Sequence, residues 1–140
     1  AVMYERLKES LDLQCNEFAQ LQVVEYMKNY GVEGHIRKIQ AAYKEKCDLM
    51  LSLMEENFPA SVKFTRPEGG MFIWVELPEG LDADGILDEA VEAGVAYIPG
   101  EFFYANDGAK NTMRLNFTTV SEEQIRKGIV LLADVLKKHA

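Results

Sequence analysis

Residues 71–77 read MFIWVEL, and this alternation of side chains decides the fold class of the 140-residue chain. Successive side chains of a strand point to opposite faces, so the odd-numbered apolar residues share one face and the even-numbered residues share the other. Further strands are predicted at residues 62–66, 95–98 and 112–117 from their length, pattern and flanking turn residues. These segments predict a small, mainly antiparallel sheet of three to four strands.

Helical spacing of apolar residues predicts that helices accompany these strands. The predicted helices cover residues 2–12, the segment from the break at 15–16 to Gly31, and residues 36–58, 82–91 and 121–138. The start of the last helix, SEEQ, has the form of a capping box. Helices that are segregated from a small antiparallel sheet and packed on it give an α+β fold.

The helix predicted at residues 36–58 carries an apolar stripe that includes Cys47, Met50 and Met54. A stripe with methionines is either an adaptable groove for a partner or a face packed into the core. In the core interpretation Cys47 is a small buried hydrophobe rather than a reactive thiol. Cys15 falls in a loop-like break, and no cationic neighbour in the sequence argues for a lowered thiol pKa.

Composition limits the kinds of partner. Lys and Arg number 15 against 23 Asp and Glu, so the net charge is −8 at pH 7. This acidic balance disfavours nucleic acid as a partner, because binding to its phosphate backbone needs a basic face. No apolar run approaches the roughly 20 residues of a membrane-spanning helix, and the first residues lack the apolar region of a signal peptide. These features predict a soluble, cytoplasmic domain without nucleic-acid or membrane partners.

The strand predicted at residues 112–117 carries one charged side chain. Its residues 113, 115 and 117 are apolar and face the core, which leaves Arg114 and Asn116 on the opposite face. Arg keeps its charge, so a half-buried guanidinium needs an anion beside it. That anion is either one of the 23 acidic side chains, in a structural ion pair, or the carboxylate of a ligand, gripped at two points.

Other polar residues indicate neither a catalytic site nor a metal site. His35 and His139 have no second ligand or nucleophile at a suggestive spacing, so both are predicted to be non-catalytic. Two cysteines are too few for a disulfide framework and lack metal-ligand spacing. The segment 68–70, EGG, is too short to cradle a phosphate.

Three C-terminal blocks carry a resemblance to a known family. They are residues 66–78, RPEGGMFIWVELP, residues 94–103, GVAYIPGEFF, and residues 111–117, NTMRLNF. In this order and at this spacing they resemble the C-terminal small domain of class I/II, fold-type I, pyridoxal-phosphate-dependent aminotransferases. The most similar subgroup contains the alpha-aminoadipate, kynurenine, and branched-chain or aromatic amino-acid aminotransferases. Residues 6–14, RLKESLDLQ, resemble the helix and turn by which that family's chain leaves its large domain.

The resemblance implies a substrate-binding site. In the family, the Arg of the RLNF-type strand grips the substrate α-carboxylate, and the matching residue here is Arg114, with Asn116 beside it. The turn of residues 69–72, which includes Gly70 and Phe72, would lie near the mouth of the pocket, although a tight turn into a strand explains it equally well. Phe102 and residues 103–104 either line the substrate from a mobile segment or pack as ordinary hydrophobic side chains.

The resemblance also implies chemistry that this chain does not carry. Family members hold pyridoxal phosphate on a Lys in a Ser-x-x-Lys-type segment, with an Asp at the pyridinium nitrogen, and both belong to the large domain. None of the lysines here stands in that context. We therefore expect residues 1–140 to be the single small domain of a longer aminotransferase, with a helix at residues 1–30 leading out of the large domain. Alone, it should be inactive and should not bind the cofactor covalently.

The expected partners of the parent enzyme are an amino acid or 2-oxo acid, its large domain, and a second copy in a homodimer. Two other functions stay open. A transcription regulator with an aminotransferase-like effector domain would carry a helix-turn-helix domain ahead of it. A stand-alone interaction domain would be a clean monomer without a large exposed apolar patch.

Overall fold

The computed structural model describes residues 2–11 and 16–139. The chain divides into two compact units, Ala1–Ile39 and Gln40–Ala140, and the boundary falls within the long helix α3 (Glu33–Asn57). The predicted break at Cys15 lies outside the described residues.

The first unit is helical. It contains α1 (Val2–Leu11) and α2 (Glu17–Tyr30), and neither helix has a buried residue. The Asn16 side chain caps α2 by accepting a hydrogen bond from the Ala19 amide at 3.0 Å. Gly31, at φ 67°, ends the helix as predicted, because this backbone conformation is unfavourable for residues with a Cβ.

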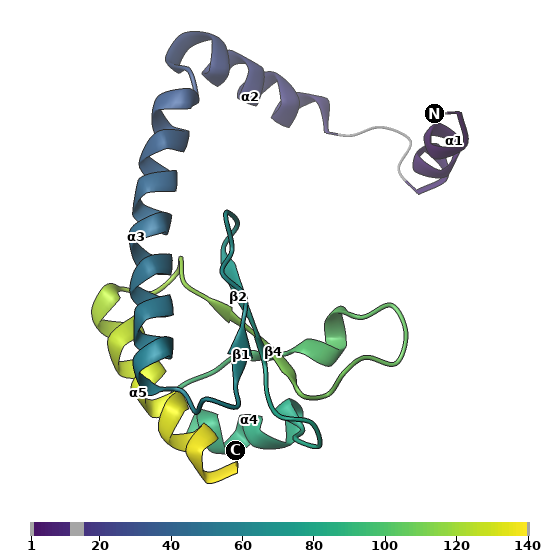
Figure 1. Ribbon diagram of the computed structural model, residues 1–140. Helices are drawn as coiled ribbons and strands as arrows, with labels where there is room; N and C mark the ends of the chain where they lie inside the picture. The colour runs from purple at the N-terminus through teal and green to yellow at the C-terminus, as the bar shows by residue number, and fades with distance from the viewer. Residues whose placement is uncertain (1, 12–15, 140) are drawn as a thin grey trace. The chain divides into compact units, whose positions relative to one another are not determined.

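The second unit holds an antiparallel four-stranded sheet with the order β1-β2-β4-β3, together with helices (Figure 1). Its elements after α3 are β1 (Lys63–Phe64), β2 (Phe72–Glu76), α4 (Ala83–Glu92), β3 (Ile98–Pro99), the 3₁₀ helix η1 (Gly100–Phe103), β4 (Thr112–Asn116) and α5 (Glu122–His139). The predicted α+β fold with a small antiparallel sheet is confirmed.

One face of this sheet forms the core. Ile73, Val75 and Met113 are fully buried there, as the strand alternation predicts. The C-terminal half of α3, α4 and α5 cover the same face, and their buried side chains join the same cluster. The α3 stripe, with Met54 fully buried and Cys47 7% exposed, is therefore core packing in this unit and not a groove.

Two predicted segments differ from the structure. Met71 is 42% exposed rather than in the core, because it precedes β2 and follows the left-handed turn at Gly70, φ 88°. The strand predicted at 95–98 begins only at Ile98, since the Val95 amide is used to close helix α4 by bonding to the Ala90 carbonyl at 2.9 Å. The helix η1 was not predicted, because four residues are too few for a periodic pattern.

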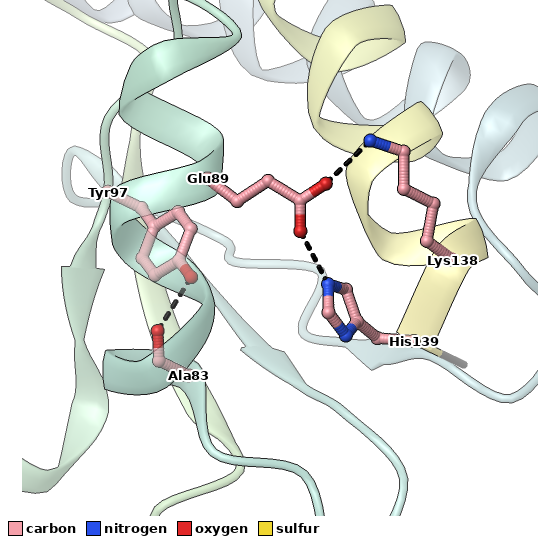
Figure 2. Close-up of polar contacts among 5 residues, drawn as sticks. All are labelled: Ala83, Glu89, Tyr97, Lys138 and His139. Atoms are coloured by element: carbon pink, nitrogen blue, oxygen red, sulfur yellow. Dashed lines mark hydrogen bonds and ion pairs between the residues drawn. The ribbon is translucent and has the colours of Figure 1, made fainter.

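Side-chain contacts tie the ends of the core helices together (Figure 2). Glu89 on α4 accepts hydrogen bonds from Lys138 at 2.5 Å and lies 2.7 Å from the ring nitrogen Nε2 of His139, both at the end of α5. The Tyr97 hydroxyl donates to the Ala83 carbonyl at 2.6 Å. These contacts hold α4 against α5 and against the residues that lead into β3.

Side-chain hydrogen bonds also fix the start of α5. Ser121 and Gln124 form the predicted capping box, with the Ser121 hydroxyl accepting from the Gln124 amide and the Gln124 side chain accepting from the Ser121 amide. On α3, Lys46 donates to the carbonyls of Thr118 at 3.0 Å and Val120 at 2.7 Å. The chain is thereby held in place between β4 and α5.

Across residues 2–11 and 16–139, no helix combines the length and apolar character needed to cross a membrane.

Candidate anion-binding site

The face of the sheet opposite the core helices carries the candidate site. Antiparallel pairing sets Trp74 on β2 directly opposite Arg114 on β4, and Phe72 directly opposite Asn116. All four side chains are half-buried, which is consistent with a face that is covered in part. The alternation that fills the core with odd-numbered residues therefore also gathers these even-numbered residues.

The Arg114 guanidinium is stacked against two aromatic rings. Its central carbon lies 3.9 Å from the centroid of the Phe72 ring and 4.0 Å from the centroid of the Phe103 ring. Both distances are well within the range of a cation–π interaction. Phe72 comes from the neighbouring strand, whereas Phe103 comes from η1. The guanidinium therefore lies against two rings that come from different parts of the chain.

No acidic side chain in the described part of the chain neutralises Arg114. None of the ion pairs found there includes it. Its Nε is fully buried and has no hydrogen-bond partner among the same residues. The internal ion pair that the sequence left open is therefore not formed within residues 2–11 and 16–139, although the chain carries 23 Asp and Glu.

A second layer of aromatic residues supports this arrangement. The Trp74 ring meets Phe103 edge to face with centroids 6.0 Å apart, and it meets Tyr104 at 6.1 Å. Such edge contacts are favourable beyond the apolar area that they bury. Gly100 allows η1 to lie this close, because a Cβ there would overlap the Thr112 side chain and come within 2.8 Å of the Trp74 ring.

Asn116 and Gly70, both predicted as substrate-binding, have structural roles that the geometry makes clear. The Asn116 Oδ1 accepts hydrogen bonds from the amides of Thr118 and Thr119 at 3.0 Å each, and its Nδ2 donates to the Met71 carbonyl at 3.3 Å. Gly70 has φ 88° and open space where a Cβ would stand, so its requirement is for backbone conformation. Both residues shape the turns at the rim of the Arg114 face.

Phe102, the fourth predicted site residue, is 67% exposed and takes no part in the ring contacts found among the described residues. Its neighbour Phe103 makes the contact with Arg114. The sequence placed Phe103 among the possible substrate-lining residues and Phe72 in the turn near the pocket mouth, but neither Phe72 nor Trp74 was predicted to lie beside Arg114. The signal available for these two was their even-numbered position in β2, on the same face as Arg114.

The remaining reactive groups lie elsewhere. Burial raises the pKa of the Cys47 thiol, so it is held as an unreactive thiol in the core. Burial also raises the pKa of the Tyr97 hydroxyl, which is bonded to the Ala83 carbonyl (Figure 2). Within the described ranges, no cluster of His, Cys, Asp and Glu side chains has the composition of a metal site.

The arrangement is suited to binding a carboxylate. The Arg114 guanidinium is held against two rings, and its planar fork matches the two oxygens of a carboxylate. Charge-assisted hydrogen bonds of this kind contribute about 1.5–3 kcal/mol each. A half-buried guanidinium against two aromatic rings, with no ion-pair partner among the described residues, is the feature that distinguishes this face from an ordinary sheet surface.

Comparison with known proteins gives consistent matches along the chain. The family described as "Aminotransferase class I and II" matches residues 13–132. Aromatic-amino-acid aminotransferase 1 of Thermococcus litoralis is 50% identical over 132 residues, which are 94% of this chain and 32% of that protein.

Solved structures agree in fold. The multiple substrate aminotransferase of Thermococcus profundus superimposes with a TM-score of 0.87 at 48% identity, over 96% of this chain and 33% of that one. LysN, an alpha-aminoadipate aminotransferase of Thermus thermophilus solved with N-(5'-phosphopyridoxyl)-L-leucine, gives a TM-score of 0.85 at 38% identity, over 95% of this chain and 34% of that one.

This chain therefore spans about a third of the length of these relatives. More distant matches include HTH-type transcriptional regulators, such as YjiR of Escherichia coli at 26% identity over 73% of this chain.

Proposed function

This chain belongs to the class I and II aminotransferase family, and on that premise we propose that it is the C-terminal small domain of a pyridoxal-phosphate-dependent aminotransferase. The reaction moves an amino group between an amino acid and a 2-oxo acid. The single observation that carries this proposal is the Arg114 guanidinium, which contacts two aromatic rings and has no acidic partner among the described residues. In our proposal it binds the α-carboxylate of the substrate.

In this proposal the cofactor supplies the chemistry, and this domain binds and orients the substrate. Pyridoxal phosphate supplies the electron sink that makes amino-group transfer possible. Arg114 holds the substrate's carboxylate at a fixed point, which restricts the orientation of the bond that reacts. The aromatic residues around it reduce the access of water to the guanidinium, and this strengthens its electrostatic attraction for the carboxylate.

No lysine of this chain follows a Ser by three positions, as the lysine of a Ser-x-x-Lys-type segment does. Lys63, which lies on β1 beside Glu76, has its amine 3.7 Å from that carboxylate. Lys46 is committed to two backbone carbonyls. We therefore propose that the lysine that carries the cofactor comes from the part of the relatives' length that this chain does not span, and that residues 1–140 alone are inactive.

Direct binding to the chain tests the carboxylate role. The probe is 3-phenylpropanoate, a simple carboxylate, and its matched control is 3-phenylpropanamide, which has the same shape without the charge. We expect the carboxylate to bind and the amide not to bind, and Arg114→Gln to abolish binding. Equal affinity of the wild-type chain and Arg114→Gln for the carboxylate would contradict the proposed role.

A regulatory protein is the second candidate, because HTH-type regulators occur among the more distant matches. A carboxylate site in an effector domain would also bind 3-phenylpropanoate, so this binding does not separate a regulator from an enzyme. The longer coding sequence separates the two functions. A Ser-x-x-Lys segment without a basic helix-turn-helix domain supports the enzyme, and an added DNA-binding domain supports the regulator.

A further inference from the structure

We propose that Phe103 is a positioning residue for Arg114, and that the docking of η1 on the sheet sets the guanidinium in the orientation that captures a carboxylate. This inference rests on the proposed function and deepens it. It assigns the control of carboxylate affinity to a residue outside the sheet, in the short helix that precedes the 104–111 segment.

The stacking partners of Arg114 are held in different ways. Phe72 lies on β2, which is hydrogen-bonded along its length to β4, so its ring is fixed by the same ladder that fixes Arg114. Phe103 lies on η1, a four-residue 3₁₀ helix, and 45% of Phe103 remains exposed. The contact between Phe103 and the Arg114 guanidinium therefore depends on side-chain packing and not on strand pairing.

That packing is specific. The Phe103 ring has the Arg114 guanidinium 4.0 Å from its centroid and the Trp74 ring centroid at 6.0 Å. At the start of η1, Gly100 approaches the sheet so closely that a Cβ would overlap Thr112 and crowd Trp74. Contacts at both ends of η1 thus determine where the Phe103 ring stands.

The second ring has a physical consequence for binding. An Arg side chain has several rotatable bonds, and fixing it on binding a ligand costs conformational entropy. Contact with two rings restricts the guanidinium beforehand, so less freedom is lost when its fork meets a carboxylate. The buried Nε, without a hydrogen-bond partner among the described residues, indicates that water is already excluded from this part of the group.

The test compares two substitutions at the same position in the full 140-residue chain. Phe103→Leu keeps an apolar side chain but removes the ring, and Phe103→Tyr keeps the ring. We expect Phe103→Leu to weaken the binding of 3-phenylpropanoate by about tenfold, which corresponds to about 1.4 kcal/mol. We expect Phe103→Tyr to bind within about twofold of wild type, because the cation–π contact is kept.

Two readouts separate positioning from a loss of fold. Urea unfolding, followed through Trp74, the only tryptophan of the chain, reports the stability of each variant. The NMR signal of the Arg114 Nε–H group, assigned by its absence in Arg114→Gln, reports ring stacking and ligand binding at the guanidinium itself. A folded Phe103→Leu chain that loses affinity, with rescue in Phe103→Tyr, supports the proposal.

The outcomes also separate this inference from the proposed function. If folded Phe103→Leu binds as tightly as wild type while Arg114→Gln does not bind, the positioning role is overturned and the carboxylate role stands. If Phe103→Tyr loses affinity as Phe103→Leu does, the ring is not the determinant and the inference fails. If wild type and Arg114→Gln bind 3-phenylpropanoate with equal affinity, the proposed carboxylate-binding function is itself contradicted.

Discussion

Trp74 and Arg114 stand directly opposite each other on the two central strands of the sheet, and their side chains share the face that the core helices leave open. This register places an aromatic ring next to the one cation of β4. The same pairing of β2 with β4 brings Phe72 to the guanidinium, and η1 adds Phe103. A sheet whose other face is a conventional apolar core thereby presents a single stacked guanidinium.

Replacing Arg114 with Lys keeps the charge but removes the planar fork. The test uses a hybrid enzyme in which this chain replaces the matching third of the Thermococcus litoralis relative, and the relative supplies the remaining two thirds. In this hybrid enzyme, Arg114→Lys should raise the KM for the amino acid by about tenfold or more, because a point charge replaces a two-point contact. Steady-state transamination kinetics measure it.

The matched control for this substitution is Arg126→Lys. Arg126 is an exposed residue of α5, and the same chemical change there should leave KM within about twofold, as surface substitutions usually have small effects. An Arg114→Lys hybrid with unchanged KM would remove Arg114 from the substrate site.

Gly100 should tolerate no side chain. Gly100→Ala would force its methyl group into Thr112 and within 2.8 Å of the Trp74 ring, so we expect a loss of about 1–3 kcal/mol in the free energy of unfolding. The control is Gly69→Ala, since a Cβ at Gly69 meets no atom within 4 Å; we expect a change within about 0.5 kcal/mol. Urea titration measures both, and equal stabilities would contradict the close packing of η1.

Asn116 separates a structural role from a binding role. Asn116→Ala removes the acceptor for the Thr118 and Thr119 amides and should lower the free energy of unfolding by about 1–2 kcal/mol. Asn116→Asp keeps that acceptor but adds a negative charge on the Arg114 face. It should therefore be more stable than Asn116→Ala, yet bind 3-phenylpropanoate more weakly than wild type. If Asn116→Asp binds as wild type does, Asn116 does not face the anion.

Much of the second unit was predictable because its signals are local. The alternation in residues 73–77 and 113–117 correctly predicted which apolar side chains would be buried, and it placed Arg114 on the face away from the core. The capping box at Ser121 and the stop at Gly31 also depend on neighbouring residues alone. Such features need no knowledge of the tertiary fold.

The composition of the site was not predictable in the same way. Phe102 and Phe103 are adjacent and chemically identical, and only the turn of η1 decides that Phe103 contacts Arg114 while Phe102 is 67% exposed. The sequence also could not exclude an internal ion pair, because any of 23 acidic residues could have reached Arg114. Both questions depend on contacts between segments that are distant in the chain.

Tyr97 should contribute to stability through one buried hydrogen bond. Its hydroxyl donates to the Ala83 carbonyl at 2.6 Å, and both residues are buried (Figure 2). Tyr97→Phe keeps the ring and removes the donor, so we expect a loss of about 1–2 kcal/mol in the free energy of unfolding. Burial raises the pKa of Tyr97, so its stabilising effect is present at neutral pH and is lost above the ordinary tyrosine pKa of about 10. Tyr97→Phe chains should lack that alkaline loss in denaturation curves.

Glu89 should make stability depend on pH at the acid end. Hydrogen bonds from Lys138 and then His139 hold the pKa of the Glu89 carboxyl below its ordinary value. A lowered pKa means that the carboxylate stabilises the fold above the ordinary pKa of about 4.3, and that this contribution is lost as the pH falls through the lowered value. Glu89→Gln should therefore be less stable than wild type at pH 7, and the difference should shrink on acidification.

The control is Glu92→Gln on the same helix, because Glu92 joins none of the ion pairs found in the described residues. If the Glu89→Gln difference stays constant from pH 7 to below the ordinary glutamate pKa, the contacts between Glu89 and the end of α5 do not stabilise the protein in solution.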